Sequence, residues 1–136
     1  MSTSSGFRGS IDLMSTAFLR AIPRLAARDV NRAVEFYESH LGFSASLHLE
    51  DYAILRRDSA EIHVGRSTVD PKANPVVCRV DVRGVTEFYE KCRALNIVHA
   101  GDALAMKPWG RLEFSVVDPD GNLVTFAEAP AAAPQG

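Results

Sequence analysis

Four side chains that can transfer protons or bind metal ions fall on predicted β-strands of this 136-residue chain: His48, Glu61, His63 and Glu113. Imidazole changes its charge near neutral pH and a carboxylate accepts protons, so such a set can supply an acid and a base. By strand alternation, all four point away from the hydrophobic core. The set is therefore either a functional site or a group of hydrogen-bonded side chains on a solvated sheet face.

The single tryptophan of the chain, Trp109, stands between Pro108 and Gly110, directly before a predicted strand. An indole on a stiff loop is a good platform for stacking a flat ligand. The alternative is a ring that folds back as a lid on the core. The strand that follows places Glu113 and Ser115 on its outward side, and Arg79 lies on the outward side of an earlier strand.

An internal repeat organises the elements that carry these residues. Asp29-Val30 is followed by Glu35-Phe36-Tyr37-Glu38, and Asp81-Val82 is followed at the same spacing by Glu87-Phe88-Tyr89-Glu90. In each copy a strand-like run precedes the match, a helical pattern follows it, and further strands complete the unit. The expected strands are Ala21–Ala27, Phe43–Leu49, Tyr52–Arg57 and Glu61–Gly65, then Val76–Val82, Ile97–Ala100, Arg111–Val117 and Leu123–Ala127.

Short-range signals support both helices. Asp29 is a good N-cap, because its carboxylate accepts the free amide protons of the first helical turn. Gly42 and Asn96 follow the helical patterns, where a left-handed residue closes the last turn. Asp58-Ser59 and Asp118-Pro119-Asp120-Gly121 provide turns between strands.

The sequence therefore predicts an α+β fold of two paired βαβββ modules, with curved mixed sheets and helices on one face. We expect a single domain over residues 17–128, with modules at about 17–66 and 75–128. Residues 1–16 are expected to form a flexible leader and residues 129–136 a disordered tail. Because the helices cover one face only, the other must be a concave surface, a partner contact or a ligand cavity.

Composition excludes several classes of function. The formal net charge of −2 provides no basic field for nucleic acid, and no apolar run is long enough to span a membrane. The two cysteines, Cys78 and Cys92, have no zinc-site spacing, and we expect reduced thiols in a cytoplasmic protein.

Several motifs together resemble the vicinal-oxygen-chelate superfamily of glyoxalases, dioxygenases and drug-resistance proteins. The βαβββ repeat is similar, as are Leu41-Gly42-Phe43 and Asp118-Pro119-Asp120-Gly121-Asn122. Four further segments are similar to the bleomycin-resistance branch: Ala21-Ile22-Pro23-Arg24-Leu25, Glu50-Asp51-Tyr52-Ala53, Arg83-Gly84-Val85 and Pro108-Trp109-Gly110-Arg111. The resemblance implies a homodimer with an exchanged N-terminal arm and with ligand clefts between the subunits. It also implies that a bleomycin-type glycopeptide is sequestered without chemistry.

The same resemblance bears on metal binding. Carried over position by position, three ligand positions of the metal-using relatives fall on Ile22, on or beside Pro75, and on Thr125. None of these suits a hard divalent ion, which prefers carboxylate or imidazole ligands. The sequence therefore predicts no metal and no other cofactor, although a displaced site built from His48, Glu61, His63 and Glu113 remains an alternative.

The predicted function is that of a small-molecule binding protein for a planar, partly polar ligand of the bleomycin type. Arg24 and Arg79 near the cleft also suit a ligand less cationic than bleomycin. One alternative is a glyoxalase- or dioxygenase-like enzyme, using a displaced metal site or no metal. Another is a dimerisation module without a ligand. The predicted ligand-binding residues are Phe43, His48, Tyr52, Glu61, His63, Arg79, Trp109, Glu113 and Ser115.

Overall fold

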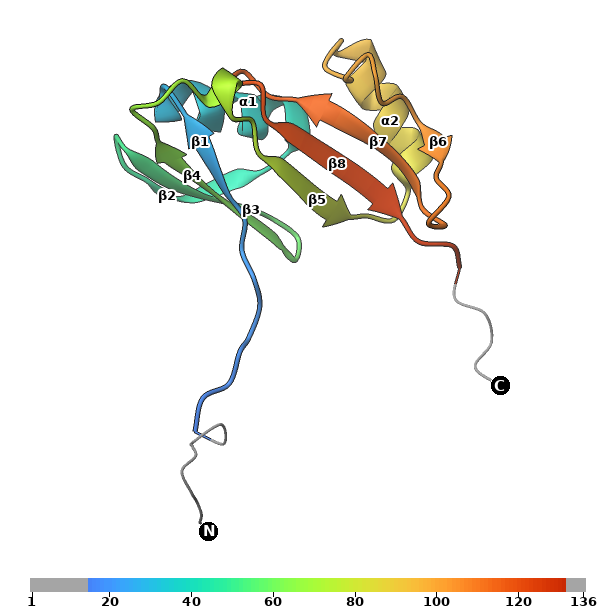
Figure 1. Cartoon of the computed structure of the whole chain (residues 1–136), viewed down its shortest axis with the longest axis horizontal. Helices are drawn as coiled ribbons and strands as arrows, with labels where there is room; N and C mark the ends of the chain where they lie inside the picture. Colours follow the sequence, from blue (N-terminus) through green and yellow to red (C-terminus); the bar gives the residue numbers. More distant parts are fainter. Residues whose placement is uncertain (1–14, 132–136) are drawn as a thin grey trace.

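The computed structural model describes residues 15–131, which form two four-stranded sheets and two α-helices (Figure 1). The first module contains β1 (Arg24–Ala27), α1 (Val30–Leu41), β2 (Ser44–His48), β3 (Tyr52–Arg57) and β4 (Ala60–Arg66). After a short 3-10 turn, η2 (Pro71–Ala73), the second contains β5 (Val77–Asp81), α2 (Val85–Ala94), β6 (Ala105–Met106), β7 (Leu112–Val117) and β8 (Leu123–Glu128).

The two sheets have the same topology. Sheet A has the strand order β1-β4-β3-β2 and sheet B the order β5-β8-β7-β6, with one parallel pair and two antiparallel pairs in each. This confirms the predicted α+β fold of two βαβββ units. Residues 1–14 of the predicted leader and 132–136 of the predicted tail lie outside the described residues.

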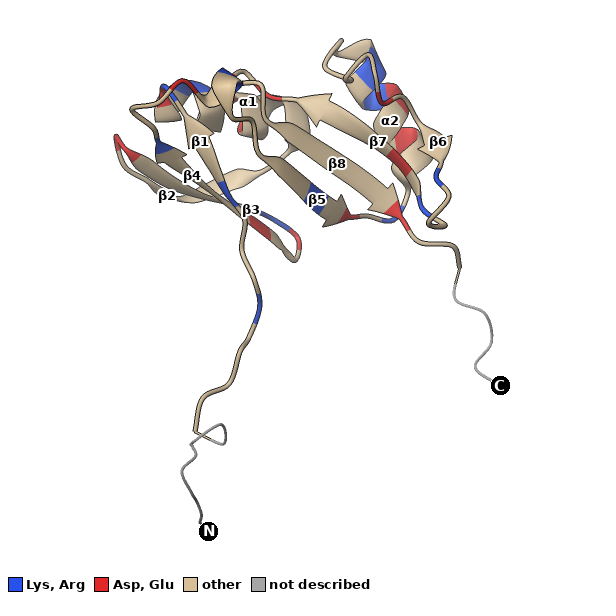
Figure 2. Ribbon diagram, in the orientation of Figure 1, with Lys and Arg blue, Asp and Glu red and all other residues tan. Residues whose placement is uncertain are grey.

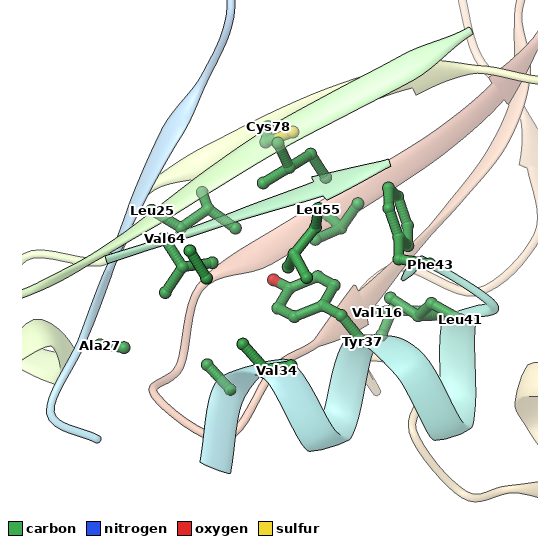
Figure 3. Close-up of a cluster of buried hydrophobic side chains, with 14 of the residues drawn as sticks. Leu25, Ala27, Val34, Tyr37, Leu41, Phe43, Leu55, Val64, Cys78 and Val116 are labelled. Carbon is green, nitrogen blue, oxygen red and sulfur yellow. The ribbon is translucent and has the colours of Figure 1, made fainter. Parts of the chain in front are cut away.

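Helix α1 begins and ends as its sequence predicts. The Asp29 carboxylate accepts hydrogen bonds from the backbone amides of Asn31 and Arg32, and Gly42 closes the helix at φ 73°. Its apolar residues recur at helical spacing, so one stripe of the helix is buried. Figure 3 shows Val34, Tyr37 and Leu41 directed into a cluster with Leu55, Val64 and Cys78.

Helix α2 begins differently, because Gly84 precedes it and offers no side-chain cap. Glu128, at the end of β8, accepts hydrogen bonds from the backbone amides of Gly84 and Val85. Phe88 and Tyr89 of this helix pack on Phe114 of β7. As predicted, Asn96 lies just past the helix in the left-handed region, at φ 60°.

The turn between β7 and β8 fastens the two modules together. The buried Asp118 carboxylate accepts a hydrogen bond from the Tyr37 hydroxyl of α1, at 2.8 Å. The side chain of Asn122, which is 0% exposed, donates to the carbonyl of Ala26 and accepts from the amide of Val76. The Asp118-to-Asn122 segment is thus a structural joint between the first sheet and the second.

One predicted strand loses three residues at its start, and another does not form. Residues 21–23 lie outside β1, which begins at Arg24 after Pro23, a residue that donates no backbone hydrogen bond. The predicted strand Ile97–Ala100 is wrong as a strand, because only an isolated bridge between Val98 and Val116 forms there. The outer strand of sheet B is instead β6, which the sequence pattern did not indicate.

Candidate ligand-binding site

A groove with a volume of about 810 Å³ runs between the two modules. Its walls come from the base of the N-terminal segment, the turn between β3 and β4, strand β5 and the start of α2. Three of the predicted site residues line it: Phe43, Glu61 and Arg79. Phe43 contributes from within the core, since its side chain is buried and makes an edge contact with the ring of Tyr37.

A second hollow, of about 550 Å³, adjoins the first at Arg79 and is also lined by Asp81, Trp109 and Arg111. The indole of Trp109 is 60% exposed, and its N–H donates to the Glu113 carboxylate at 2.9 Å. Both terminal nitrogens of Arg79 donate to the same carboxylate, at 3.2 and 2.7 Å. Glu113, itself only 3% exposed, therefore holds an aromatic ring and a guanidinium at one hollow.

Behind Glu113, a partly buried polar network supports the loop that carries Trp109. Ser115 donates to the Asp102 carboxylate and shares a hydrogen bond with Thr125, while Lys107 pairs with Asp102 at 2.7 Å. Burial opposes ionisation of Asp102, but the hydrogen bonds from Lys107 and Ser115 outweigh it and lower the pKa of Asp102. Ser115 is only 1% exposed, so it supports the site through this network.

A second cluster lies on the face of sheet A that the helices leave open. His63 is hydrogen-bonded through Nε2 to Glu61, at 2.7 Å, and through Nδ1 to the Tyr52 hydroxyl, at 2.6 Å. Glu61 also pairs with Arg20 and Arg56. The hydrogen bond from His63 and the two arginines together lower the pKa of Glu61, so this carboxylate is ionised at neutral pH.

The expectation that His48 shares this open face is wrong. A β-bulge shifts the register of β2 between Ala45 and Leu47, and the alternation of side chains reverses after it. His48 is consequently paired with the buried Ala53 and bonds to Asn31 at the start of α1. It lies on the helix side of sheet A, on the face opposite Glu61 and His63.

Sequence reasoning missed two residues of the site. Arg111 lines the hollow beside Trp109, and the only available signal was its place directly after the Pro108-Trp109-Gly110 loop. Asp102 lies in a segment without periodic pattern, so its contact with Ser115 had no sequence signal.

The residues at this site do not fit the metal centre of the metal-using relatives. Ile22 is apolar, and Thr125 is buried in a hydrogen bond with Ser115. Within residues 15–131, no group of three or more His, Cys, Asp or Glu side chains is arranged to hold a metal ion. The displaced set is also separated, because His48 faces α1 and Glu113 belongs to sheet B.

The two cysteines are not suited to act as nucleophiles. Cys78 and Cys92 are free and buried, and burial raises the pKa of each thiol to about 11. Neither is thereby an activated nucleophile at neutral pH.

None of the helices in the described part of the chain has the length and apolarity needed to cross a membrane.

The hydrogen bond from the Trp109 indole to the Glu113 carboxylate, the anchor of Trp109, should be lost only in acid. The paired hydrogen bonds from Arg79, and then the bond from Trp109, lower the pKa of Glu113. The anchor is therefore present above the ordinary carboxyl pKa and is lost only as the pH falls through the lowered value. We expect Trp109 fluorescence to stay constant from pH 8 to about pH 5 and to change only below about pH 4.

The variant Glu113→Gln should show altered Trp109 fluorescence already at neutral pH, because the amide cannot bind the Arg79 guanidinium as a carboxylate does. Asp81→Asn is the matched control, since Asp81 lines the same hollow without bonding to Trp109. A wild-type transition near neutral pH, or one retained in Glu113→Gln, would contradict the assignment of the anchor to Glu113.

Comparison with known proteins agrees with this architecture. A family model described as Glyoxalase/Bleomycin resistance protein/Dioxygenase superfamily matches residues 19–126. The bleomycin resistance protein of Geobacillus stearothermophilus is 30% identical over 125 residues, which cover 79% of this chain and 95% of that protein. The bleomycin resistance protein of Klebsiella pneumoniae is 29% identical over 119 residues, covering 80% and 91%.

Solved structures show the same fold. A bleomycin-binding protein complexed with bleomycin has 27% identity and a TM-score of 0.72, with 83% of this chain and 100% of that chain covered. The bleomycin-binding protein of Streptomyces verticillus, complexed with copper(II)-bleomycin, has 28% identity, a TM-score of 0.73, and 85% and 99% coverage. On the family model, the relatives and the repeated βαβββ topology, this chain belongs to the glyoxalase/bleomycin resistance protein/dioxygenase superfamily.

Proposed function

We propose that this protein binds an antibiotic of the bleomycin type and sequesters it without altering it chemically. The observation that carries the proposal is the exposed indole of Trp109, held by Glu113 beside Arg79 at an open hollow. An oriented ring stacks on a flat heteroaromatic group at little entropic cost. The names of the relatives and the bleomycin complexes of similar structures support the same ligand class.

We further propose that two copies form the complete site. The segment before β1 extends away from the rest of the molecule (Figure 1) and exposes Phe18 by 97% and Leu19 by 89%. Strand β5 is at the edge of sheet B, with no strand beyond it in the described part of the chain. An apolar arm and an unpaired strand edge are complementary features, so arm exchange between two copies would cover both. Clefts lined by both subunits would then hold the drug.

Titration with bleomycin tests the proposal. Because Trp109 is the only tryptophan, its fluorescence reports directly on the hollow. We expect saturable quenching with a Kd below about 10 µM. Sedimentation of the complex should give twice the mass of the chain, and mass spectrometry should recover the drug unchanged. No fluorescence change at tens of micromolar bleomycin, or recovery of a modified drug, would contradict this function.

A further inference from the structure

One cationic side chain on the open face of sheet A has no counter-charge. The guanidinium of Arg24 has no hydrogen-bonded or ion-paired partner within residues 15–131. It is nevertheless placed by its surroundings, with its Cζ 5.8 Å from the ring centroid of Tyr52. It also covers Gly65, where a Cβ atom would overlap the guanidinium. Its N–H donors are therefore available on a surface that fixes their position.

The charges around Arg24 leave this face with a positive excess. Arg20 and Arg56 both pair with Glu61, and Arg24 adds a third cation against that single carboxylate. Figure 2 shows both signs of charge where the N-terminal segment meets sheet A. An anion arriving at Arg24 would gain a charge-assisted hydrogen bond without displacing an existing partner.

Apolar side chains share the same face. Leu47 is partly exposed and is paired with Ile54 on the outward side of β2 and β3, while Ile22, 37% exposed, stands two residues before Arg24. Ile54 is in turn the register partner of His63. We infer that the cluster of Arg24, Tyr52 and His63 binds the carboxylate of a ligand whose body is apolar.

The hydrogen bonds of His63 make this binding depend on a proton. Because Glu61 is an ionised acceptor, His63 must present an N–H from Nε2. In the neutral imidazole, Nδ1 is then an acceptor, and the Tyr52 hydroxyl donates its hydrogen bond to it. When His63 is protonated, Nδ1 donates to the Tyr52 oxygen instead. The hydroxyl proton is then free to bond to a carboxylate, so the carboxylate prefers the protonated cluster.

Charged and titratable groups from each neighbouring element face His63. They are Arg24 from β1, Tyr52 and Arg56 from β3, Glu61 from β4 itself, and Arg20 from the N-terminal segment. A carboxylate bound at Arg24 would offset the arginine charge, so proton uptake and carboxylate binding should reinforce each other.

Benzoate, with benzamide as its neutral analogue, tests the assignment on the full-length protein. We expect benzoate to bind at pH 6 with a Kd of about 1 mM and benzamide to bind at least ~10-fold more weakly. Arg24→Gln should weaken benzoate binding by ~10-fold or more. Gly65→Ala, which displaces the guanidinium and removes no charge, should do the same. Arg66→Gln is the matched control, because Arg66 is an exposed arginine paired with Ala27, whose side chain faces the core.

The proton linkage has its own readout. Benzoate affinity should rise about 10-fold between pH 8 and pH 5.5, across the range in which imidazole titrates. Calorimetry in two buffers of different ionisation enthalpy should then show uptake of up to one proton. Tyr52→Phe should keep the contribution of Arg24 and retain only the smaller part of the pH dependence that comes from the charge of His63. Equal binding of benzoate and benzamide, full binding by Arg24→Gln, or an unchanged pH dependence in Tyr52→Phe would each overturn the inference.

This inference does not depend on bleomycin being the ligand. Its probe reports on sheet A, whereas the bleomycin titration reports on Trp109 of the second module. Binding of benzoate without binding of bleomycin would support the carboxylate site and contradict the proposed function. The reverse result would remove the carboxylate site alone.

Discussion

Replacing Asn122 by alanine is expected to lower the free energy of unfolding by about 3 kcal/mol. The side chain is fully buried and bonds to Ala26 at 2.9 Å, to Val76 at 3.0 Å and to Asp118 at 3.0 Å. Its loss leaves a partly buried carbonyl and a partly buried amide without these partners, and each costs roughly 1–3 kcal/mol. Urea denaturation measures the change, and the Tm should fall by about 10 °C.

Asn74→Ala is the control for this prediction. Asn74 is exposed at the end of η2, and only its backbone amide forms a hydrogen bond, to Pro71. Its replacement should change the unfolding free energy by less than about 0.5 kcal/mol. If the two variants unfold at the same urea concentration, then Asn122 does not join the modules in the way described.

The expected size of the effect reflects where Asn122 lies. Its neighbour Asp118 accepts hydrogen bonds from Tyr37 and from the backbone amides of Asp120 and Asn122, yet burial outweighs them and raises the pKa of Asp118. Burial, and then the nearby Asp118, raise the pKa of Tyr37 well above its usual value. The joint between the modules is therefore a buried polar network, in which one missing member leaves the others unsatisfied.

The repeated sequence was sufficient to predict the repeated topology. The matching Glu-Phe-Tyr-Glu segments lie within the two helices, and each module then arranges its strands in the same order. Local rules also held at Asp29, Gly42 and Asn96, because capping depends on a few adjacent backbone atoms. Signals of this range can be read from the sequence without knowledge of tertiary contacts.

The error at His48 arose where one backbone irregularity reversed the side-chain alternation of a strand. The bulge in β2 moved His48 to the helix side, and no residue type near Ser46 signals it. Strand alternation placed Glu113 and Ser115 outward, as the structure shows, but it did not predict that the segment from Asp102 to Trp109 covers them. Such coverage depends on long-range packing of an irregular loop, which carries no periodic pattern.

The two parts of the candidate site also differ in what the sequence revealed. Trp109 was identified because a lone indole between proline and glycine is unusual, and its anchor emerged only from the geometry of Glu113. The unpaired state of Arg24 had no sequence signal at all, since pairing depends on which carboxylates the fold brings near. Glu61 is near, but Arg20, Arg56 and His63 occupy its oxygens.

Replacing Trp109 by alanine is expected to weaken bleomycin binding by about 10-fold. The variant loses one stacked ring, worth about 1–2 kcal/mol. Because the indole is largely exposed, the fold should tolerate the change, and the urea midpoint should stay close to that of the wild type. Isothermal calorimetry is the appropriate measurement, since this variant has no tryptophan to report fluorescence.

Two further variants separate stacking from general loss of apolar surface. Trp109→Phe keeps an aromatic face but lacks the N–H that bonds to Glu113, so it should bind with intermediate affinity. Leu95→Ala removes a side chain that is 46% exposed at the end of α2, on the helix side of sheet B, and should bind bleomycin as the wild type does. Wild-type affinity in Trp109→Ala would show that the ring is not the platform. Equal losses in Trp109→Ala and Leu95→Ala would show that the effect is not specific to the hollow at Arg79.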